Sequence, residues 1–223
     1  YFLLTLIEAL LHTNAVLYIL DPKNADLADL GTVMPNVFHT KEEMIDCVNS
    51  FYEGMVQRSE EMKRHPNYKT GENYAYLGLP PCFLIFDEYV AFFEMLGVKE
   101  STSLLSQLKK IVMLGRQAGY FLIVACQRPD AKYFSDGIRD NFNFRVGLGR
   151  ISELGYGMLF GSDVKKQFFQ KRIKGRGYCD VGTSVISEFY TPLVPKGHDF
   201  LQTIGSLAQA RQDGTATCEA KGD

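Results

Sequence analysis

The chain has 223 residues, of which 46 % are hydrophobic and 22 % are charged, and its formal net charge is −2. This length and composition suit one α/β domain with a sizeable core and argue against disorder. A protein that coats nucleic acid non-specifically is usually far more basic, so any nucleic-acid contact must come from a local patch.

The cysteines favour a reducing, cytoplasmic setting. No pair has metal-ligand or redox spacing, and an odd number fits no disulfide framework. The five are Cys47, Cys82, Cys126, Cys179 and Cys218. The four histidines are scattered, so we expect no zinc site. No apolar run reaches the length of a transmembrane helix, and there is no signal-peptide pattern.

The N-terminal half alternates helical and strand patterns. Residues 1–11 are nearly all apolar and predict a buried helix, although nothing precedes it that could cap its first turn. Residues 15–20 predict a strand that ends at Asp21-Pro22. Thr40 and Glu43 form a capping-box pattern, which predicts a long amphipathic helix that ends near His65.

The second half continues this alternation. After a proline-rich loop at 66–81, the sequence predicts strands at 82–86 and 120–125 with a helix from about 101 to 118 between them. The remaining predicted elements are a strand at 144–148, a partly helical region at 152–170, terminal strands within 178–190 and a polar tail from about 211. Strands that are apolar on both faces and alternate with helices predict a mostly parallel sheet covered on each side.

Polar residues follow four of the predicted strands, namely Asp21, Asp87-Glu88, Gln127-Arg128 and Arg150. In open α/β sheets the carboxyl ends of the strands form the ligand-binding edge. Acidic and polar groups that converge there suit a magnesium-bound nucleotide.

The sharpest motif is Phe83-Leu-Ile-Phe-Asp87-Glu88, a Walker B pattern. Asp87 would hold Mg²⁺ against the nucleotide phosphates, and Glu88 would orient and deprotonate the attacking water. Gln127, after the next strand, would sense the γ-phosphate or place the water. The alternative for each is a strand end that carries polar residues by chance.

The phosphate-binding loop, Gly-x-x-x-x-Gly-Lys-Ser/Thr, does not occur in these residues. In a P-loop enzyme a mostly apolar helix follows that loop directly, and the chain opens on such a helix. We therefore expect the loop to lie just before Tyr1, and the chain alone to bind nucleotide poorly and to be inactive.

Four segments together resemble the FtsK/SpoIIIE family. They are Tyr18-Ile-Leu-Asp-Pro-Lys23, Leu84-Ile-Phe-Asp-Glu-Tyr89, Gly115-Arg-Gln-Ala-Gly119 and Ala125-Cys-Gln-Arg-Pro129. The resemblance extends to about residue 160 and is greatest to the versions in conjugative transposons of Gram-positive bacteria. It implies a RecA-like P-loop ATPase core, hexameric rings, ATP and Mg²⁺, and double-stranded DNA pulled through a central channel.

The resemblance also implies roles for single residues. Arg116 matches the arginine supplied in trans to the neighbouring subunit's nucleotide, with a helix-end cation as the alternative. Arg150 falls where the family has a lysine near the γ-phosphate, with a surface cation as the alternative. Asp21, in the Asp-Pro-Lys motif, is a candidate nucleotide-binding residue, whereas the motif assigns Lys23 no definite role.

A basic run without an intervening acid is the candidate DNA contact. It consists of Lys165, Lys166, Lys171, Arg172, Lys174 and Arg176. Such a run would track phosphates with a salt-sensitive affinity. The alternative is a solvated charged face.

The leading hypothesis is therefore an ATP-driven translocase of double-stranded DNA, for conjugative transfer or DNA segregation. Residues 1–210 would form the motor domain and residues 211–223 a polar tail. The parent protein would be anchored at the inner face of the membrane and would meet conjugation proteins, while the fragment alone fits a monomer. The alternatives are an FtsK-like ATPase of a protein secretion system and a non-catalytic docking domain of the same fold.

Overall fold

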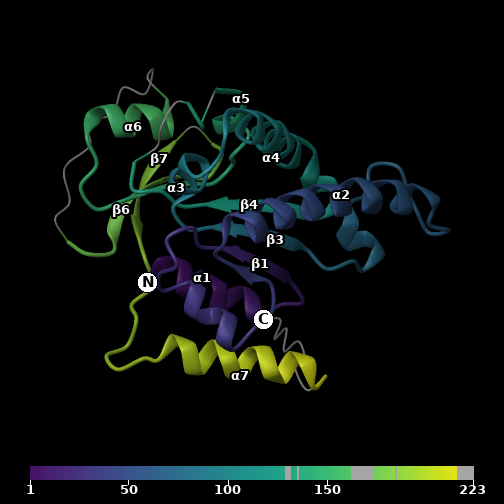
Figure 1. Ribbon diagram of the computed structural model, residues 1–223, viewed down its shortest axis with the longest axis horizontal. Coiled ribbons are helices and arrows are strands. Elements are labelled where there is room, and N and C mark those ends of the chain that lie inside the picture. The colour runs from purple at the N-terminus through teal and green to yellow at the C-terminus, as the bar shows by residue number, and fades with distance from the viewer. Residues whose placement is uncertain (129–131, 135, 162–172, 184, 215–223) are drawn as a thin grey trace. The chain divides into compact units, whose positions relative to one another are not determined.

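The computed structural model describes residues 1–128, 132–134, 136–161, 173–183 and 185–214 (Figure 1). The chain forms two compact units. The first comprises Tyr1, Leu3–Cys126 and the residues from Gly197 onward, and the second comprises Gln127–Lys196 with Phe2.

The first unit is built on a parallel sheet of four strands, as the sequence predicts. In spatial order these are β2 (Val37–Phe38), β1 (Val16–Leu20), β3 (Cys82–Phe86) and β4 (Tyr120–Val124). The central strand β3 pairs with β1 on one side and β4 on the other, in register from its first residue to its last. All four carboxyl ends therefore lie at one edge of the sheet.

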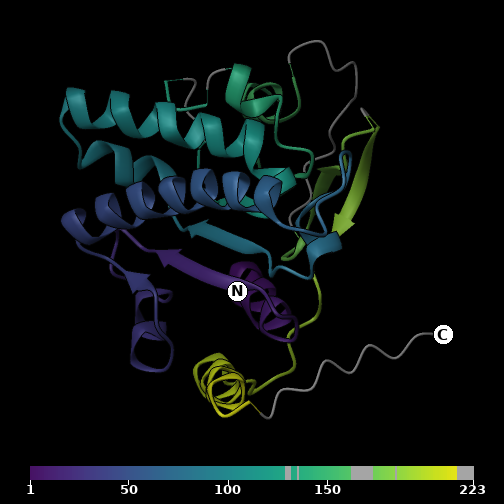
Figure 2. The same cartoon turned by 90° about the vertical axis from the view of Figure 1, so that its right-hand side faces the viewer.

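One face of this sheet is covered by two long helices, α2 (Lys41–Arg64) and α4 (Val98–Ala118). Phe51 of α2 contacts the rings of Tyr18 in β1 and Tyr120 in β4, with centroids 5.4 and 4.8 Å away. The helices run beside each other along much of their length (Figure 2). Thr40 and Glu43 form the predicted capping box of α2, which fixes where it begins.

Two further helices pack together at the β1 side of the sheet. These are α1 (Phe2–Leu11), predicted from its apolar sequence, and α7 (Phe200–Gln212), which sequence reasoning missed. Arg211 of α7 donates hydrogen bonds of 2.9 and 2.7 Å to the carbonyls of Thr13 and Ala15. The sequence signals for α7 were an N-cap at Asp199, whose carboxylate accepts a hydrogen bond from the Gln202 amide, and apolar residues four positions apart, which the structure buries.

Several shorter elements also differ from the prediction. The helix α3 (Tyr89–Glu94) follows β3 after only two residues, and α4 begins at Val98 rather than near Ser101. The predicted loop contains the 3₁₀ turn η2 (Tyr74–Leu77), and η1 (Ala28–Thr32) precedes β2. The α3 sequence is aromatic and β-branched, with weak helix propensity, and packing of its rings on Phe86 holds it instead.

The second unit contains an antiparallel sheet, β5 (Arg145–Leu148), β6 (Arg176–Asp180) and β7 (Ile186–Tyr190). The described residues of this unit also include the helices α5 (Asp136–Arg139) and α6 (Glu153–Phe160). Tyr156 and Phe160 of α6 pack with Tyr178 and Ile186 to form its core. Strands β6 and β7 are close in sequence, a spacing that favours antiparallel pairing.

Within the described part of the chain, no helix is both long and apolar enough to cross a membrane.

Candidate active site at the end of the parallel sheet

Asp21 directly follows β1 and is fully buried. Its carboxylate accepts three backbone hydrogen bonds, from the amides of Lys23 at 3.1 Å, Ala25 at 2.8 Å and Ala28 at 3.0 Å. Asp21 therefore fixes the loop between β1 and η1, because its oxygens satisfy amides that would otherwise lack acceptors. This contact set explains its place in the Asp-Pro-Lys motif, and a nucleotide contact by Asp21 stays a prediction.

Asp87 directly follows β3, beside Asp21 at the same sheet edge. Its amide donates a 2.9 Å hydrogen bond to the Leu20 carbonyl, which holds the two strand ends together. Burial raises the pKa of the Asp87 carboxyl, and the negative charges of Asp21 and Glu88 raise it further. The sequence expectation that carboxylates gather at this edge is thus met.

Glu88 has a left-handed backbone, with φ 51° and ψ 56°. This conformation is uncommon for a residue other than glycine, and such local strain is concentrated at functional sites. The surrounding contacts hold it, because the Tyr89 amide donates a 2.8 Å hydrogen bond to the Ala125 carbonyl beyond β4. The turn directs the chain abruptly from β3 into α3.

Lys23 is the residue whose role sequence reasoning missed. Its ammonium nitrogen lies 3.5 Å from Oε2 of Glu88, and the two side chains are 45 % and 17 % exposed. The only sequence signal was its place in the Asp-Pro-Lys motif. The pair forms because β1 and β3 are adjacent parallel strands, so the segments that follow them share one edge.

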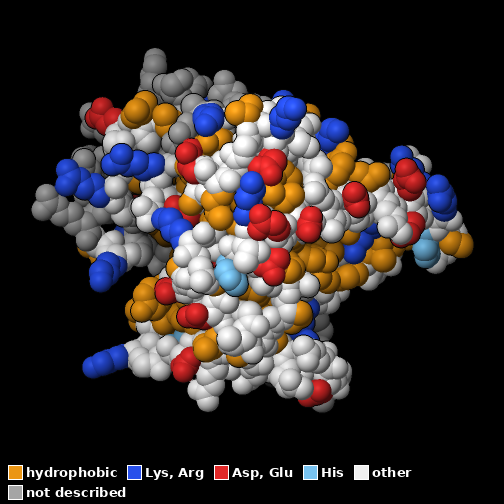
Figure 3. All heavy atoms as spheres, viewed as in Figure 1, with side chains coloured by type: hydrophobic (Ala, Val, Ile, Leu, Met, Phe, Trp, Pro, Cys, Tyr) orange, Lys and Arg blue, Asp and Glu red, His pale blue; other side chains and the backbone are white. Residues whose placement is uncertain are grey.

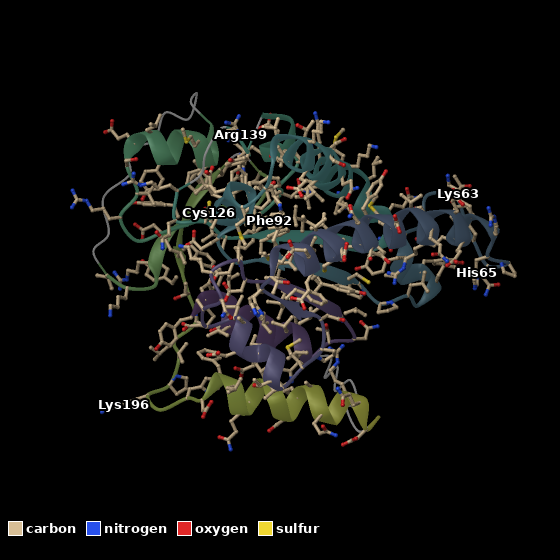
Figure 4. The ribbon with its side chains drawn as sticks, viewed as in Figure 1. Lys63, His65, Phe92, Cys126, Arg139 and Lys196 are labelled. Atoms are coloured by element: carbon tan, nitrogen blue, oxygen red, sulfur yellow. The ribbon has the colours of Figure 1, made fainter. Side chains whose placement is uncertain are left out.

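Cys126 lies close to Glu88. Burial raises the pKa of its thiol to about 11, and the Glu88 charge contributes to the rise. Cys126 is a free, half-buried thiol, whereas Cys82 is almost fully buried. In Figure 4, Cys126 and Phe92 lie well away from Lys63 and His65, which mark the far end of α2.

Arg116 lies in the last turn of α4, at the opposite edge of the sheet from Asp87 and Glu88. Since α4 leads directly into β4, Arg116 precedes the start of that strand, and β4 runs parallel to β3. The five-residue strand alone separates its two ends by roughly 13 Å. Arg116 is exposed and has no ion-pair partner among the described residues. Arg116 therefore lies away from the carboxylates of its own chain, and its predicted role in trans stays a prediction.

Gln127 and Arg150 belong to the second unit, and both are exposed. The sequence analysis placed Arg150 at the end of a strand of the parallel sheet, and this prediction was wrong. The strand before it, β5, pairs antiparallel with β6 in the second sheet. Their predicted contacts with the nucleotide stay predictions.

Part of the predicted basic run lies near Arg150. The Gly149 amide donates a 2.9 Å hydrogen bond to the Arg176 carbonyl, which places Arg150 at the same end of the sheet as Lys174 and Arg176. The guanidinium of Arg176 lies 4.9 Å from the centroid of the Tyr190 ring. Figure 3 shows several Lys and Arg side chains over the area of β6 and α6. Lys165, Lys166, Lys171 and Arg172 lie outside the described residues.

The acidic edge fits a magnesium ion. Mg²⁺ prefers carboxylate oxygens and usually keeps several waters and phosphate ligands, so it needs only one or two protein carboxylates. Burial, and after it the charges of Asp21 and Glu88, raises the pKa of Asp87, and a bound divalent cation would stabilise the ionised carboxylate there. No group of three or more His, Cys, Asp or Glu side chains arranged as a metal site occurs in the described ranges.

Comparisons with known proteins agree with this geometry. No protein-family model matches the chain. Over all 223 residues the chain is 54 % identical to the FtsK domain-containing protein YdcQ of Bacillus subtilis strain 168. It covers 46 % of that protein, so the chain spans about half the length of the curated relative it matches.

Solved structures with the same fold include a conjugation coupling protein and proteins named as ATPases. The pCW3 conjugation coupling protein TcpA, solved as a monomer with ATPγS, has a TM-score of 0.73 and 18 % identity, over 94 % of this chain and 59 % of that one. The cytoplasmic domain of the type VII secretion ATPase EccC of Thermomonospora curvata has a TM-score of 0.65 and 19 % identity, over 92 % and 26 %. EssC of Geobacillus thermodenitrificans has a TM-score of 0.64 and 16 % identity, over 96 % and 41 %.

The helix-flanked parallel sheet with its Walker B carboxylates has the RecA-like fold of P-loop ATPases. With the sequence relationship to an FtsK domain added, the chain belongs to the FtsK/SpoIIIE-type ATPases.

Proposed function

We propose that the chain forms most of the motor core of an ATPase that translocates double-stranded DNA, in conjugative transfer or DNA segregation. The observation that carries the proposal is the pair Asp87 and Glu88 at the carboxyl end of β3, beside buried Asp21, in an FtsK-type chain. Asp87 would hold Mg²⁺, which would supply positive charge against the nucleotide phosphates, and Glu88 would accept the proton of the attacking water. The proposed γ-phosphate contacts are Gln127 and Arg150.

The placement of Arg116 supports a head-to-tail ring. A residue at the opposite sheet edge cannot serve the nucleotide of its own subunit, but it can reach that of a neighbour if subunits repeat by rotation. An arginine that enters in this way stabilises charge on the transferring phosphoryl group. The ring, hexameric in this proposal, surrounds the DNA. A basic surface that includes Lys174 and Arg176 contacts its phosphates.

Hydrolysis also requires a phosphate-binding loop. The 223 residues contain no Gly-x-x-x-x-Gly-Lys-Ser/Thr sequence, so we propose that they hydrolyse ATP slowly or not at all by themselves. The functional assay therefore uses the polypeptide as encoded, with any residues that precede Tyr1 retained.

A second candidate function is protein transport. One structure with this fold is named as the cytoplasmic domain of a type VII secretion ATPase, EccC, and another is EccC in complex with a signal sequence peptide. TcpA is instead named as a conjugation coupling protein. The 54 % identical relative carries only the name of an FtsK domain. In either case we place this part of the protein in the cytoplasm, with a membrane anchor elsewhere in the polypeptide.

The deciding experiment measures ATP hydrolysis by the encoded protein with Mg²⁺, with and without duplex DNA, beside Glu88→Gln. DNA-stimulated turnover that disappears in Glu88→Gln supports the DNA motor. Turnover that duplex DNA does not stimulate at low salt contradicts the DNA motor and favours protein transport. Absence of turnover, in a protein that carries a phosphate loop, favours a third candidate, a non-catalytic docking domain.

A further inference from the structure

The ion pair between Lys23 and Glu88 joins two neighbouring strand ends of the parallel sheet. Lys23 lies in the loop after β1, and Glu88 is the second residue after β3. The Lys23 Nζ atom lies 3.5 Å from Oε2 of Glu88, which is within ion-pair distance. Glu88 is the less exposed partner, at 17 %. An ion pair between two freely moving surface side chains contributes little, so its value depends on how firmly each partner is held.

Both partners are held by their backbones. The Lys23 amide donates to Oδ1 of buried Asp21, which fixes the start of the loop. Glu88 is fixed by its left-handed turn and by the hydrogen bond from the next amide, that of Tyr89, to the Ala125 carbonyl. The ion pair therefore joins two defined positions, which reduces the conformational entropy lost when it forms.

The pairing uses one oxygen of the Glu88 carboxylate. Lys23 approaches Oε2, and among the described residues no donor contacts Oε1. A lysine ammonium has no acceptor atom, so Lys23 cannot take a proton from a water. The proton acceptor in this pair is therefore a carboxylate oxygen of Glu88. Fixing Oε2 leaves Oε1 in a defined place, where it can accept a proton from such a water.

We propose that Lys23 is a positioning residue that orients the Glu88 carboxylate for proton abstraction. The inference rests on the proposed ATPase function and adds a residue to its machinery. Lys23 acts through Glu88 rather than on the nucleotide. It thereby gives a physical reason for the lysine of the Asp-Pro-Lys motif, while Asp21 holds the loop that carries it.

Two other roles for Lys23 predict different kinetics. A lysine that binds the nucleotide phosphates contributes to nucleotide affinity, so its removal raises KM. A lysine that restrains Glu88 in an unproductive position slows the reaction, so its removal raises kcat. A positioning lysine acts on the transition state through the base, so its removal lowers kcat and leaves KM nearly unchanged.

The experiment compares Lys23→Met, Lys23→Arg and Glu88→Gln in the encoded protein, by steady-state ATP hydrolysis. We expect Lys23→Met to lower kcat by about 10- to 100-fold, as a misplaced catalytic group does, with KM changed less than about threefold. Lys23→Arg restores most of the rate, because it keeps the positive charge. Arg64→Met is the matched control, since Arg64 forms an ion pair with Glu60 at the same 3.5 Å, near the far end of α2.

A double-mutant cycle of melting temperatures tests the ion pair without an activity assay. The melting temperatures of wild type, Lys23→Met, Glu88→Gln and the double variant should be non-additive by about 1–3 °C if the side chains interact. Additive shifts show that the pair does not form in solution and overturn the inference.

The kinetic outcomes separate the inference from the function on which it rests. Wild-type turnover that Glu88→Gln abolishes but Lys23→Met leaves unchanged overturns only the positioning role. A raised KM or a raised kcat in Lys23→Met also overturns it, in favour of the phosphate or the restraining role respectively. A wild type without turnover overturns the proposed function, and the positioning role falls with it.

Discussion

The guanidinium of Arg58 lies 4.7 Å from the centroid of the Tyr120 ring and joins α2 to the amino end of the sheet. The same group donates hydrogen bonds of 2.7 Å to the Pro80 carbonyl and 3.3 Å to the Ala118 carbonyl. Arg58 therefore links α2, the segment before β3 and the end of α4 through one side chain. These contacts lie at the sheet edge opposite Glu88.

Arg58→Ala should destabilise the protein without a direct effect on the active site. The change leaves two partly buried carbonyls without a donor and removes the cation–π contact, at a cost of about 1–3 kcal/mol. Chemical denaturation of Arg58→Ala and of the surface control Arg64→Ala would measure this difference. An equal, small loss in both variants would contradict the role assigned to Arg58.

Gly115, in the motif before β4, should not tolerate a side chain. An added Cβ would collide with the carbonyl oxygen of Tyr120, a backbone atom that cannot easily move aside. We expect Gly115→Ala to lower the melting temperature by several degrees, in line with the cost of about 1–3 kcal/mol for overpacking. Gly31→Ala is the control, because a Cβ there meets Val37 at an ordinary 3.7 Å. A Gly115→Ala melting temperature equal to that of the control would show that the backbone adapts.

Asp21→Ala should unfold the loop after β1 rather than act only on nucleotide binding. The change removes the acceptor of three amide hydrogen bonds at a fully buried position. We expect a lower melting temperature and faster proteolysis near Ala25 in the absence of any nucleotide. Asp26→Ala, at an exposed position in the same loop, should change neither. A stable Asp21→Ala protein with only weakened nucleotide binding would instead support a direct ligand role.

Asp87→Asn should stabilise the fold while it abolishes hydrolysis. The pKa of Asp87 is raised in the folded state by burial and by Asp21 and Glu88, so ionisation of this carboxyl opposes folding. The penalty is present above the raised pKa and vanishes as pH falls below the ordinary value near 3.8. The melting-temperature gain of Asp87→Asn should therefore be positive at pH 7–8 and shrink toward zero near pH 4.

Differential scanning fluorimetry between pH 4 and 8 would measure this gain, with exposed Asp46→Asn as the control. A gain that is constant with pH would point to a cause other than ionisation. A loss of stability at neutral pH would contradict the electrostatic account of Asp87.

Cys126 should react slowly with alkylating reagents at neutral pH. The thiolate is the nucleophile, and a pKa of about 11 leaves very little of it at pH 7. We expect the rate of iodoacetamide labelling to rise about tenfold for each pH unit between 7 and 10. Labelling as fast as that of free cysteine would contradict the buried, anionic surroundings of the thiol.

Local sequence signals determined much of the first unit. The strands β1, β3 and β4 are short apolar runs closed by polar residues, and Thr40 with Glu43 marks the start of α2 by contacts within one helical turn. The Walker B carboxylates follow directly from their position after such a run. These features depend on residues close together in the chain, so the sequence alone specifies them.

Only the tertiary structure decided which distant residues meet. The ion pair of Lys23 with Glu88 requires the parallel pairing of β1 and β3, and the docking of α7 requires the carbonyls that receive Arg211. The antiparallel course of β5 likewise depends on its partner β6 rather than on its own apolar residues. Contacts between segments far apart in the chain are set by the packing of the whole unit, and no pattern confined to one segment encodes them.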